Sequence, residues 1–208
     1  MIDLSIKEFL GKLGSAAPVP GGGGAAALNA ARAIRERDTT GSIVMVSEEP
    51  YAPYNRPMLT KALLAGLTPE QLAMESPEWY QENRVYQVLG KRAEQVDLAK
   101  REVTLSGGEV LQFTKLIYAL GSECFIPPMP GSELEGVVAV RRLADVRRVE
   151  ALMKQTKHAV VIGGGVLGLE AAWELKKAGL SVTVLEVAPR LMPRQLDETA
   201  AALLTAAA

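Results

Sequence analysis

Three glycines in the second half of the chain, Gly163, Gly165 and Gly168, have the spacing of a dinucleotide-binding turn. In this pattern the first glycine permits a tight turn, the second lets a pyrophosphate approach the backbone, and the third lets a helix pack closely on a strand. The pyrophosphate would face unpaired N–H groups at the positive end of the helix dipole. Glu186, about 20 residues further on, can accept hydrogen bonds from both hydroxyls of a ribose. The spacing therefore predicts a site for the diphosphate and one ribose of a dinucleotide.

Glu186 also bears on which coenzyme would bind. A carboxylate at this position would repel the 2′-phosphate of NADP, so the residue favours NAD. Arg190 follows four residues later, and its guanidinium could receive that phosphate instead. The residues favour NAD and leave NADP open.

The elements around these glycines have the order that such a site needs. An apolar run over 159–162 predicts a buried strand, helix-forming residues over 169–178 predict a helix that ends at Gly179, and a second apolar run over 182–185 predicts another strand. Glycines of this spacing also occur in ordinary turns. Here the order of strand, turn, helix, strand and acid favours the dinucleotide site.

A second glycine group stands near the N-terminus, where Gly22, Gly24 and Ala27 fit the same pattern with alanine in the third place. A helix over 25–37 and a strand over 42–46 are predicted to follow, and Glu48 then takes the ribose position. Pro18 and Pro20 precede the glycines, and each lacks the N–H that a central strand donates. The segment before this second turn is therefore a poor candidate for the first strand of a nucleotide-binding unit.

A loop rich in proline and tyrosine follows Glu48 and leads to a short helix predicted over 60–65. Two cations of this segment, Arg56 and Lys61, could contact a phosphate or an electron-rich ring. They could equally be solvated surface charges, and the residues alone do not decide between these alternatives.

The middle of the chain changes character. A surface helix is predicted over 76–81, and then three short strands over 93–97, 102–105 and 110–113, with a hairpin turn at Gly107 and Gly108, form a predicted β-meander. The apolar run 116–120 is predicted to be a fourth, buried strand. The proline-rich segment 124–131 is a predicted domain boundary, and a helix is predicted over 143–153.

The composition excludes several classes of protein. The chain has 208 residues, a net charge of −1 and 48% hydrophobic residues, which indicates a soluble globular protein without the basic surface of a nucleic-acid binder. Neither a membrane span nor a signal peptide is found, so we expect a cytoplasmic protein with no membrane partner. One cysteine, Cys124, and one histidine, His158, offer no disulfide, no redox pair and no metal site.

Four segments together resemble one family. These are NAARAIRERD; VSEEPYAPYNRPMLTKALLAG; KLIYALGS with FIPPMPG; and VVIGGGVLGLEAAWELKKAGLSVTVLEVAPRLMPRQLDE. They resemble the N-terminal half of the FAD-dependent pyridine nucleotide-disulfide oxidoreductase superfamily, in the branch of rubredoxin reductases, ferredoxin reductases and NADH-binding nitrite reductases.

The resemblance implies an α/β fold in which a partial Rossmann-like FAD domain with a β-meander, over 25–122, is followed by the first half of an inserted NAD-binding Rossmann-like domain, over 123–208. By matching position, FAD would be held by the glycine group at Gly22, Gly24 and Ala27 and by Glu48, with Arg56 and Lys61 beside the flavin. NADH would be held by Gly163, Gly165, Gly168 and Glu186. Glu170 would approach the nicotinamide and flavin rings, which makes Lys61 and Glu170 the implied catalytic residues.

Two departures from the family pattern matter. The strand before the domain crossing normally ends in Ala-Thr-Gly, whereas here it ends in Ala119-Leu120-Gly121. The redox cysteines of the disulfide reductases are absent from their places, which points to an outside electron acceptor such as a rubredoxin or a ferredoxin.

Residues 1–24 resemble something else. The segment LSIKEFLGKLGSAAPVPGGGGAAAL is similar to the start of the formiminotetrahydrofolate cyclodeaminase and methenyltetrahydrofolate cyclohydrolase family, which are helical folate enzymes. The match explains Pro18 and Pro20, and suggests a joined reading frame.

The leading hypothesis is an NADH-dependent flavoprotein reductase that passes electrons from NADH through FAD to an external acceptor. Whether this chain is active by itself is left open. One alternative is a nucleotide-binding module of a larger complex without catalysis of its own. A second alternative is a folate cyclohydrolase or cyclodeaminase, which would be almost wholly helical.

Overall fold

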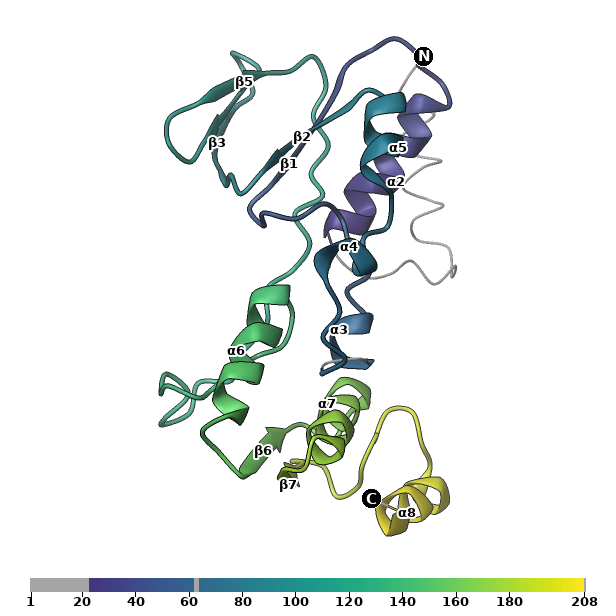
Figure 1. The fold of residues 1–208 in the computed structure, drawn as a ribbon, viewed down its shortest axis with the longest axis vertical. Coiled ribbons are helices and arrows are strands. Elements are labelled where there is room, and N and C mark those ends of the chain that lie inside the picture. Colours follow the sequence, from purple (N-terminus) through teal and green to yellow (C-terminus); the bar gives the residue numbers. More distant parts are fainter. Residues whose placement is uncertain (1–22, 62–63, 208) are drawn as a thin grey trace. The chain divides into compact units, whose positions relative to one another are not determined.

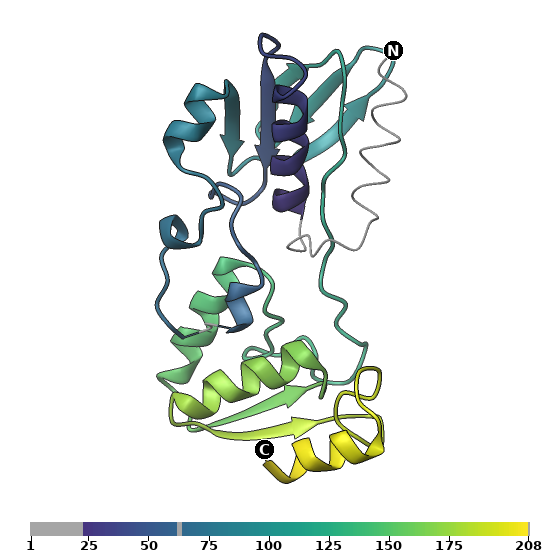
Figure 2. The same cartoon turned by 90° about the vertical axis from the view of Figure 1, so that its right-hand side faces the viewer.

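The computed structural model describes residues 23–61 and 64–207, and it divides into two compact units. The first comprises the chain up to Arg56 together with Leu72–Ser122, and the second comprises Pro57–Gln71 and Glu123–Ala208. The second unit therefore includes a short segment that leaves the first unit and returns to it (Figures 1 and 2).

The first unit is built on a parallel pair of strands. Its described elements, in chain order, are α2 (Gly23–Arg35), β1 (Ile43–Ser47), α5 (Pro77–Glu82), β2 (Val85–Leu89), β3 (Ala93–Asp97), β4 (Glu102–Leu105) and β5 (Val110–Gln112). Strands β1 and β2 pair in parallel, with Ile43 opposite Val85 and Ser47 opposite Leu89. Strands β3, β4 and β5 form a separate antiparallel sheet, which confirms the predicted meander.

The core of this unit lies between α2, α5 and the strand pair (Figure 1). Its buried members are Leu28, Ala31, Met45, Tyr80 and Val85. The small alanines of α2 let the helix lie close to the strands, because a helix presents residues three and four apart on one face.

The second unit repeats the parallel arrangement with a longer helix. Its described elements are α3 (Met58–Lys61), α4 (Pro69–Leu72, which reaches into the first unit), α6 (Leu143–Met153), β6 (His158–Ile162), α7 (Val166–Lys177), β7 (Ser181–Leu185) and α8 (Glu198–Ala207). Strands β6 and β7 pair in parallel, with Val160 opposite Thr183. Leu175 and Leu180 form the buried centre, against which α6 and one face of the strand pair pack.

Strand β6 and β7 joined through α7 form a βαβ unit, and together with the meander this gives the predicted mixed α/β fold. Strands over 93–112 and 158–185 also differ from the nearly all-helical fold that the folate alternative requires.

In the first unit, one predicted strand is wrong and one observed strand, β2, was not predicted. The run 116–120 forms no strand, and its large side chains are exposed, with Tyr118 62% and Leu120 82% accessible. Apolar composition predicts burial only where a covering surface is at hand, and within the described residues no strand pairs with this run. Strand β2 was not predicted, because Gln87 interrupts its apolar pattern.

The predicted N-terminal helix over 1–13 and most of the glycine-rich stretch, including Gly22, lie outside the described residues. Among the helices that the structure describes, none has the length and apolar character that a bilayer crossing demands.

Candidate functional site: a glycine turn at the start of helix α7

Strand β6 leads through a glycine turn directly into helix α7, as the sequence predicts. Gly163 has a φ of +114°, which an L-residue with a side chain rarely adopts, and Gly165 is the N-cap of α7. The N–H of Gly163 donates to the carbonyl of Leu185 at 2.7 Å, so the turn is tied to the end of β7. The carboxyl ends of both parallel strands therefore meet beside the N-terminus of α7, which is where open α/β sheets bind ligands.

The glycines of the turn differ in what surrounds them. A Cβ on Gly168 would overlap the carbonyl oxygen of Gly163, so helix and turn can approach this closely only without a side chain. A Cβ on Gly165 would meet nothing within 4 Å. The space at Gly165 is open to an approaching group, while the space at Gly168 is filled by the turn itself. These are the two different reasons for glycine that a pyrophosphate-binding turn requires.

The first turn of α7 supplies donors for an anion. The N–H of Leu169 donates to the carbonyl of Gly165 at 3.0 Å. The N–H groups of the helix before Leu169 have no carbonyl one turn earlier within the helix to bond to. Twelve residues of aligned peptide dipoles stand behind them. The arrangement favours a phosphate or pyrophosphate over a neutral ligand.

Glu186 lies at the rim of this turn, immediately after β7. One oxygen of its carboxylate, Oε2, accepts from the N–H of Gly164 at 2.7 Å, and Oε1 accepts from the N–H of Ala188 at 2.8 Å. The hydrogen bonds from Ala188 and then Gly164 lower the pKa of Glu186 below its ordinary value. A fixed negative charge therefore stands beside the amides that would receive a diphosphate, at the position expected for a ribose ligand.

The loop after Glu186 covers one side of the turn. The N–H of Met192 donates to the carbonyl of Gly164 at 2.9 Å, and a Cβ on Gly164 would lie 2.6 Å from Leu191 Cδ2. Sequence reasoning missed this contact of Leu191 with the turn, since nothing in the local pattern announces it. Arg190 donates to the carbonyl of Pro193 at 3.3 Å, so its guanidinium is folded into its own loop in this structure.

Glu170 lies one turn into α7, and its carboxylate is bound by a residue from a distant part of the chain. Thr60 Oγ1 donates to Glu170 Oε2 at 2.8 Å. Thr60 belongs to α3, is buried, and precedes Lys61, whose side chain is exposed. The structure thus places two implied catalytic residues, Lys61 and Glu170, in the same unit.

In the first unit, Gly23 and Gly24 both belong to α2, so Gly24 lies in the helix rather than in a turn before it. A Cβ on Gly23 would run into the backbone of residues 119–121, and a Cβ on Gly24 would lie 3.5 Å from Pro53 Cα. Ala27 is half-buried on the same helix and packs against the core. Close approach of backbone therefore accounts for glycine at Gly23, whereas a Cβ on Gly24 would make an ordinary van der Waals contact.

Glu48 follows β1 as predicted, with its Oε1 4.0 Å from Arg92 Nη1. Arg56 is not a solvated cation: its guanidinium pairs with Glu49 and lies over the ring of Tyr54, 4.8 Å from the centroid. The hydroxyl of Tyr54 donates to the same Glu49 at 2.6 Å. Glu49 and Tyr54 therefore fix the orientation of Arg56, which the spacing of charges in the sequence did not reveal.

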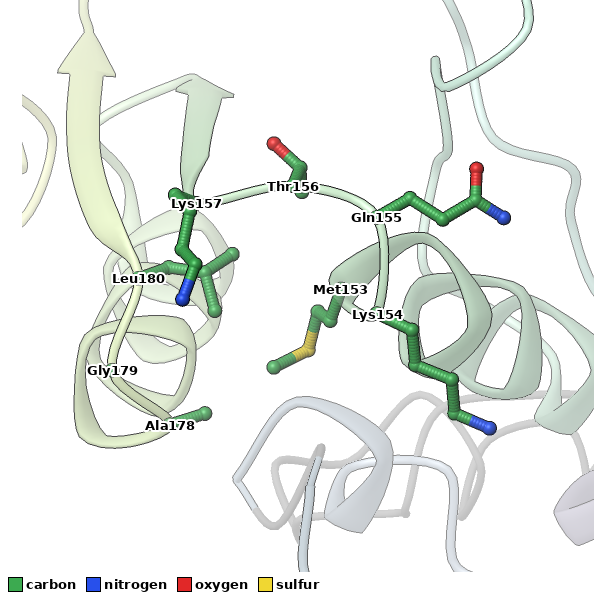
Figure 3. Close-up of a pocket in the computed structure, with 8 residues that line it drawn as sticks. All are labelled: Met153, Lys154, Gln155, Thr156, Lys157, Ala178, Gly179 and Leu180. Carbon is green, nitrogen blue, oxygen red and sulfur yellow. The ribbon is translucent and has the colours of Figure 1, made fainter.

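A hollow of about 240 Å³ opens at the other end of the βαβ unit (Figure 3). It is lined by Met153, Lys154, Gln155, Thr156, Lys157, Ala178, Gly179 and Leu180. It lies at the amino ends of β6 and β7 and at the last turn of α7, so it is separate from the glycine turn. In the described ranges, 23–61 and 64–207, no group of three or more His, Cys, Asp or Glu side chains is placed to hold a metal ion.

Comparison with known proteins agrees with this geometry. The family model for pyridine nucleotide-disulphide oxidoreductases matches residues 22–208. A second model, formiminotransferase-cyclodeaminase, matches only residues 5–38, in agreement with the resemblance of the N-terminus.

Individual relatives are reductases. The chain is 36% identical over 186 residues to rubredoxin-NAD(+) reductase of Pseudomonas putida, an alignment that covers 89% of this chain and 48% of that protein. It is 39% identical over 162 residues to nitrite reductase [NAD(P)H] of Bacillus subtilis (strain 168), which covers 78% of this chain and 20% of that protein. Among solved structures, the ferredoxin reductase for the CYP199A2 system from Rhodopseudomonas palustris superposes with a TM-score of 0.79 at 28% identity, over 90% of this chain and 46% of that one. The chain thus spans less than half the length of these relatives.

Proposed function

The chain belongs to the pyridine nucleotide-disulphide oxidoreductase family, and from that premise we propose that it forms the nucleotide-binding half of an NADH-dependent flavoprotein reductase. Its cofactors are FAD and NAD, and its electrons leave to an external acceptor of the rubredoxin, ferredoxin or nitrite reductase type. The observation that carries the proposal is the open space at Gly165, at the start of α7 and next to Gly164, whose N–H donates to the carboxylate of Glu186.

The residues of the second unit fit a nicotinamide dinucleotide. The diphosphate would lie against the turn over 163–168, because Gly165 leaves open space there and the first amides of α7 precede its helical hydrogen bonds. The hydroxyls of the adenosine ribose would donate hydrogen bonds to the carboxylate of Glu186. They would replace the hydrogen bonds that this carboxylate accepts from the N–H groups of Gly164 and Ala188. The negative charge of Glu186 and the inward position of Arg190 support NADH over NADPH as the bound form.

The residues of the first unit support an FAD site in the same way. Close approach of α2 to the backbone of 119–121 and the acidic residue Glu48 after β1 match a second, adenine-side nucleotide site. Arg56, held by Glu49 and Tyr54, is a rigid cation that would bind the cofactor with little loss of side-chain entropy. When both cofactors are bound, NADH supplies a hydride that the flavin accepts and passes on as electrons.

The proposal is tested with the full chain by two binding measurements. Addition of FAD, followed by gel filtration, should leave a protein with the visible absorption of bound flavin. Titration with NADH should quench tryptophan fluorescence and saturate. Absence of flavin uptake would remove the FAD half of the proposal, and absence of NADH binding would remove the rest.

A second function rests on the length of the match. Because the chain spans 20% to 48% of the two relatives compared above, it could serve as a nucleotide-binding module whose catalysis depends on a further part. The two functions are separated by steady NADH oxidation with ferricyanide as acceptor. Sustained turnover by this chain alone contradicts the module, whereas binding without turnover favours it.

A further inference from the structure

We propose that Thr60 is a positioning residue for the nicotinamide end of the site, acting through Glu170; this rests on the proposed function. Short helix α3 packs on α7, and the two lie side by side in both views of the unit (Figures 1 and 2). The contact includes one side-chain hydrogen bond between residues 110 positions apart, from Thr60 Oγ1 to Glu170 Oε2.

The burial of the two partners differs, and this indicates which one is fixed. Thr60 is 6% exposed, so its hydroxyl sits in the packed contact and has few rotamers to choose from. Glu170 is half-buried on α7 and has three rotatable bonds. A buried donor thus holds one oxygen of a flexible carboxylate, and the carboxylate loses rotamer freedom before any ligand arrives.

The position of Glu170 on α7 indicates what it would meet. It lies four residues after Val166, about 6 Å along the helix axis from the amides that would bind the diphosphate. Glu186 takes the adenosine side of the turn, so the second half of the dinucleotide extends away from Glu186. The neighbouring Lys61 is exposed on the same short helix. The geometry assigns Thr60 the task of presenting Glu170 to the nicotinamide ring.

Two ligands separate this role from general support of the fold. NADH carries the nicotinamide, whereas ADP-ribose ends before it and uses only the glycine turn and Glu186. Thr60→Val removes the hydroxyl at nearly constant volume, and Thr60→Ser keeps the hydroxyl. We expect Thr60→Val to raise the dissociation constant of NADH by about two- to tenfold, the range for disorder of one side chain. Thr60→Ser should stay within about twofold of the unmodified chain, and ADP-ribose should bind all three equally.

A double-mutant cycle with Glu170→Ala tests the route through Glu170. In that background Thr60→Val should add little to the loss, because the acceptor that Thr60 holds is already gone. Equal effects of Thr60→Val with and without Glu170→Ala would overturn the proposal, as would equal losses for NADH and ADP-ribose, which indicate damage to the turn. If Thr60→Val does not fold, Glu170→Ala alone must weaken NADH and spare ADP-ribose, and the opposite result overturns the proposal.

The inference and the proposed function fail in different ways. An unmodified chain that binds neither NADH nor ADP-ribose overturns both. A chain that binds both ligands, with Thr60→Val identical to the unmodified protein, overturns the role of Thr60 and leaves the dinucleotide site in place.

Discussion

Two glycines of one turn differ in the space around them, and the proposed dinucleotide site gives each its own measurable role. Gly168 has no room for a side chain because the carbonyl of Gly163 fills the space, while Gly165 faces open space. We expect Gly168→Ala to lower the free energy of unfolding by about 1–3 kcal/mol, the cost of overpacking. Gly165→Ala should leave the unfolding transition unchanged and weaken NADH binding at least tenfold, because its Cβ would stand where the diphosphate approaches.

Thermal unfolding and NADH titration of both variants check this contrast. Gly108→Ala in the hairpin of the first unit is the control for NADH binding: its φ of +84° strains an alanine, so the variant should lose stability and bind NADH unchanged. If Gly165→Ala binds NADH as tightly as the unmodified chain, the open space at Gly165 is not the diphosphate site.

The charge of Glu186 gives a prediction for the dependence of stability on pH. Hydrogen bonds from Ala188 and Gly164 depress the pKa of this carboxyl in the folded state. Its contribution is therefore fully present above about pH 4.3, the ordinary value for glutamate, and is lost as the pH falls through the lower folded-state pKa. From about pH 6 to about pH 3, which brackets the ordinary pKa of glutamate, the melting temperature of the unmodified chain should fall more steeply than that of Glu186→Gln.

Backbone hydrogen bonds also lower the pKa values of Asp38 and Asp97. The unmodified chain and Glu186→Gln therefore both lose stability in acid. Only the difference between the two curves reports Glu186. Parallel curves would mean that the hydrogen bonds from the N–H groups of Gly164 and Ala188 do not favour the ionised form of Glu186.

At the residue scale, the sequence predicts residues whose role is set by the local backbone, and it does not predict side-chain pairs that form only when distant segments pack. The roles of Gly163 and Gly168 follow from spacing alone, because each is imposed by the local turn. The pairing of Arg56 with Glu49 and of Thr60 with Glu170 depends on how segments pack. Spacing along the chain could not distinguish a held cation at Arg56 from a solvated one.

At the scale of elements, strong periodic patterns were predicted well. The predicted helix over 143–153 and the strands over 93–97 and 102–105 have the same bounds in the structure. Glycines with positive φ at 107 and 108 confirm the hairpin turn. The prediction of a strand over 116–120 failed because apolar composition carries no information on whether a neighbouring strand is present. Strand β2 was missed because Gln87 interrupts its apolar pattern.

Helix α6 depends on a cap that can be removed. Asp145 Oδ2 accepts from the N–H groups of Arg142 at 2.7 Å and Arg141 at 2.9 Å, which would otherwise be orphan donors at the helix start. Asp145→Ala should lower the free energy of unfolding by about 1 kcal/mol. Arg148→Ala, at an exposed position of the same helix, is the matched control and should change it by less than about 0.5 kcal/mol. Equal effects in urea unfolding would show that the cap contributes nothing specific.

At the scale of the whole molecule, each unit carries its own parallel strand pair, with α2 in the first unit and α7 in the second. Pro57–Gln71 belongs to the second unit, although both neighbouring segments belong to the first. A ligand that binds α7 therefore acts on the same unit as Pro57–Gln71, which chain order alone would place in the first unit. The helix α3 that carries Lys61 is part of this connection.

This division predicts where each cofactor acts, and hydrogen exchange read by mass spectrometry can locate it. At a concentration 100 times its dissociation constant, a ligand stabilises the form that binds it by about 2.7 kcal/mol. NADH should slow exchange over 158–190 and over the helix at 58–61, because α3 packs on α7, and should leave the meander over 93–112 unchanged. FAD should slow exchange over 23–56, the segment that holds α2, β1 and the loop of Arg56. Protection of 93–112 by NADH, or of 158–190 without any effect at 58–61, would contradict the proposal that NADH acts on the unit that contains both α7 and α3.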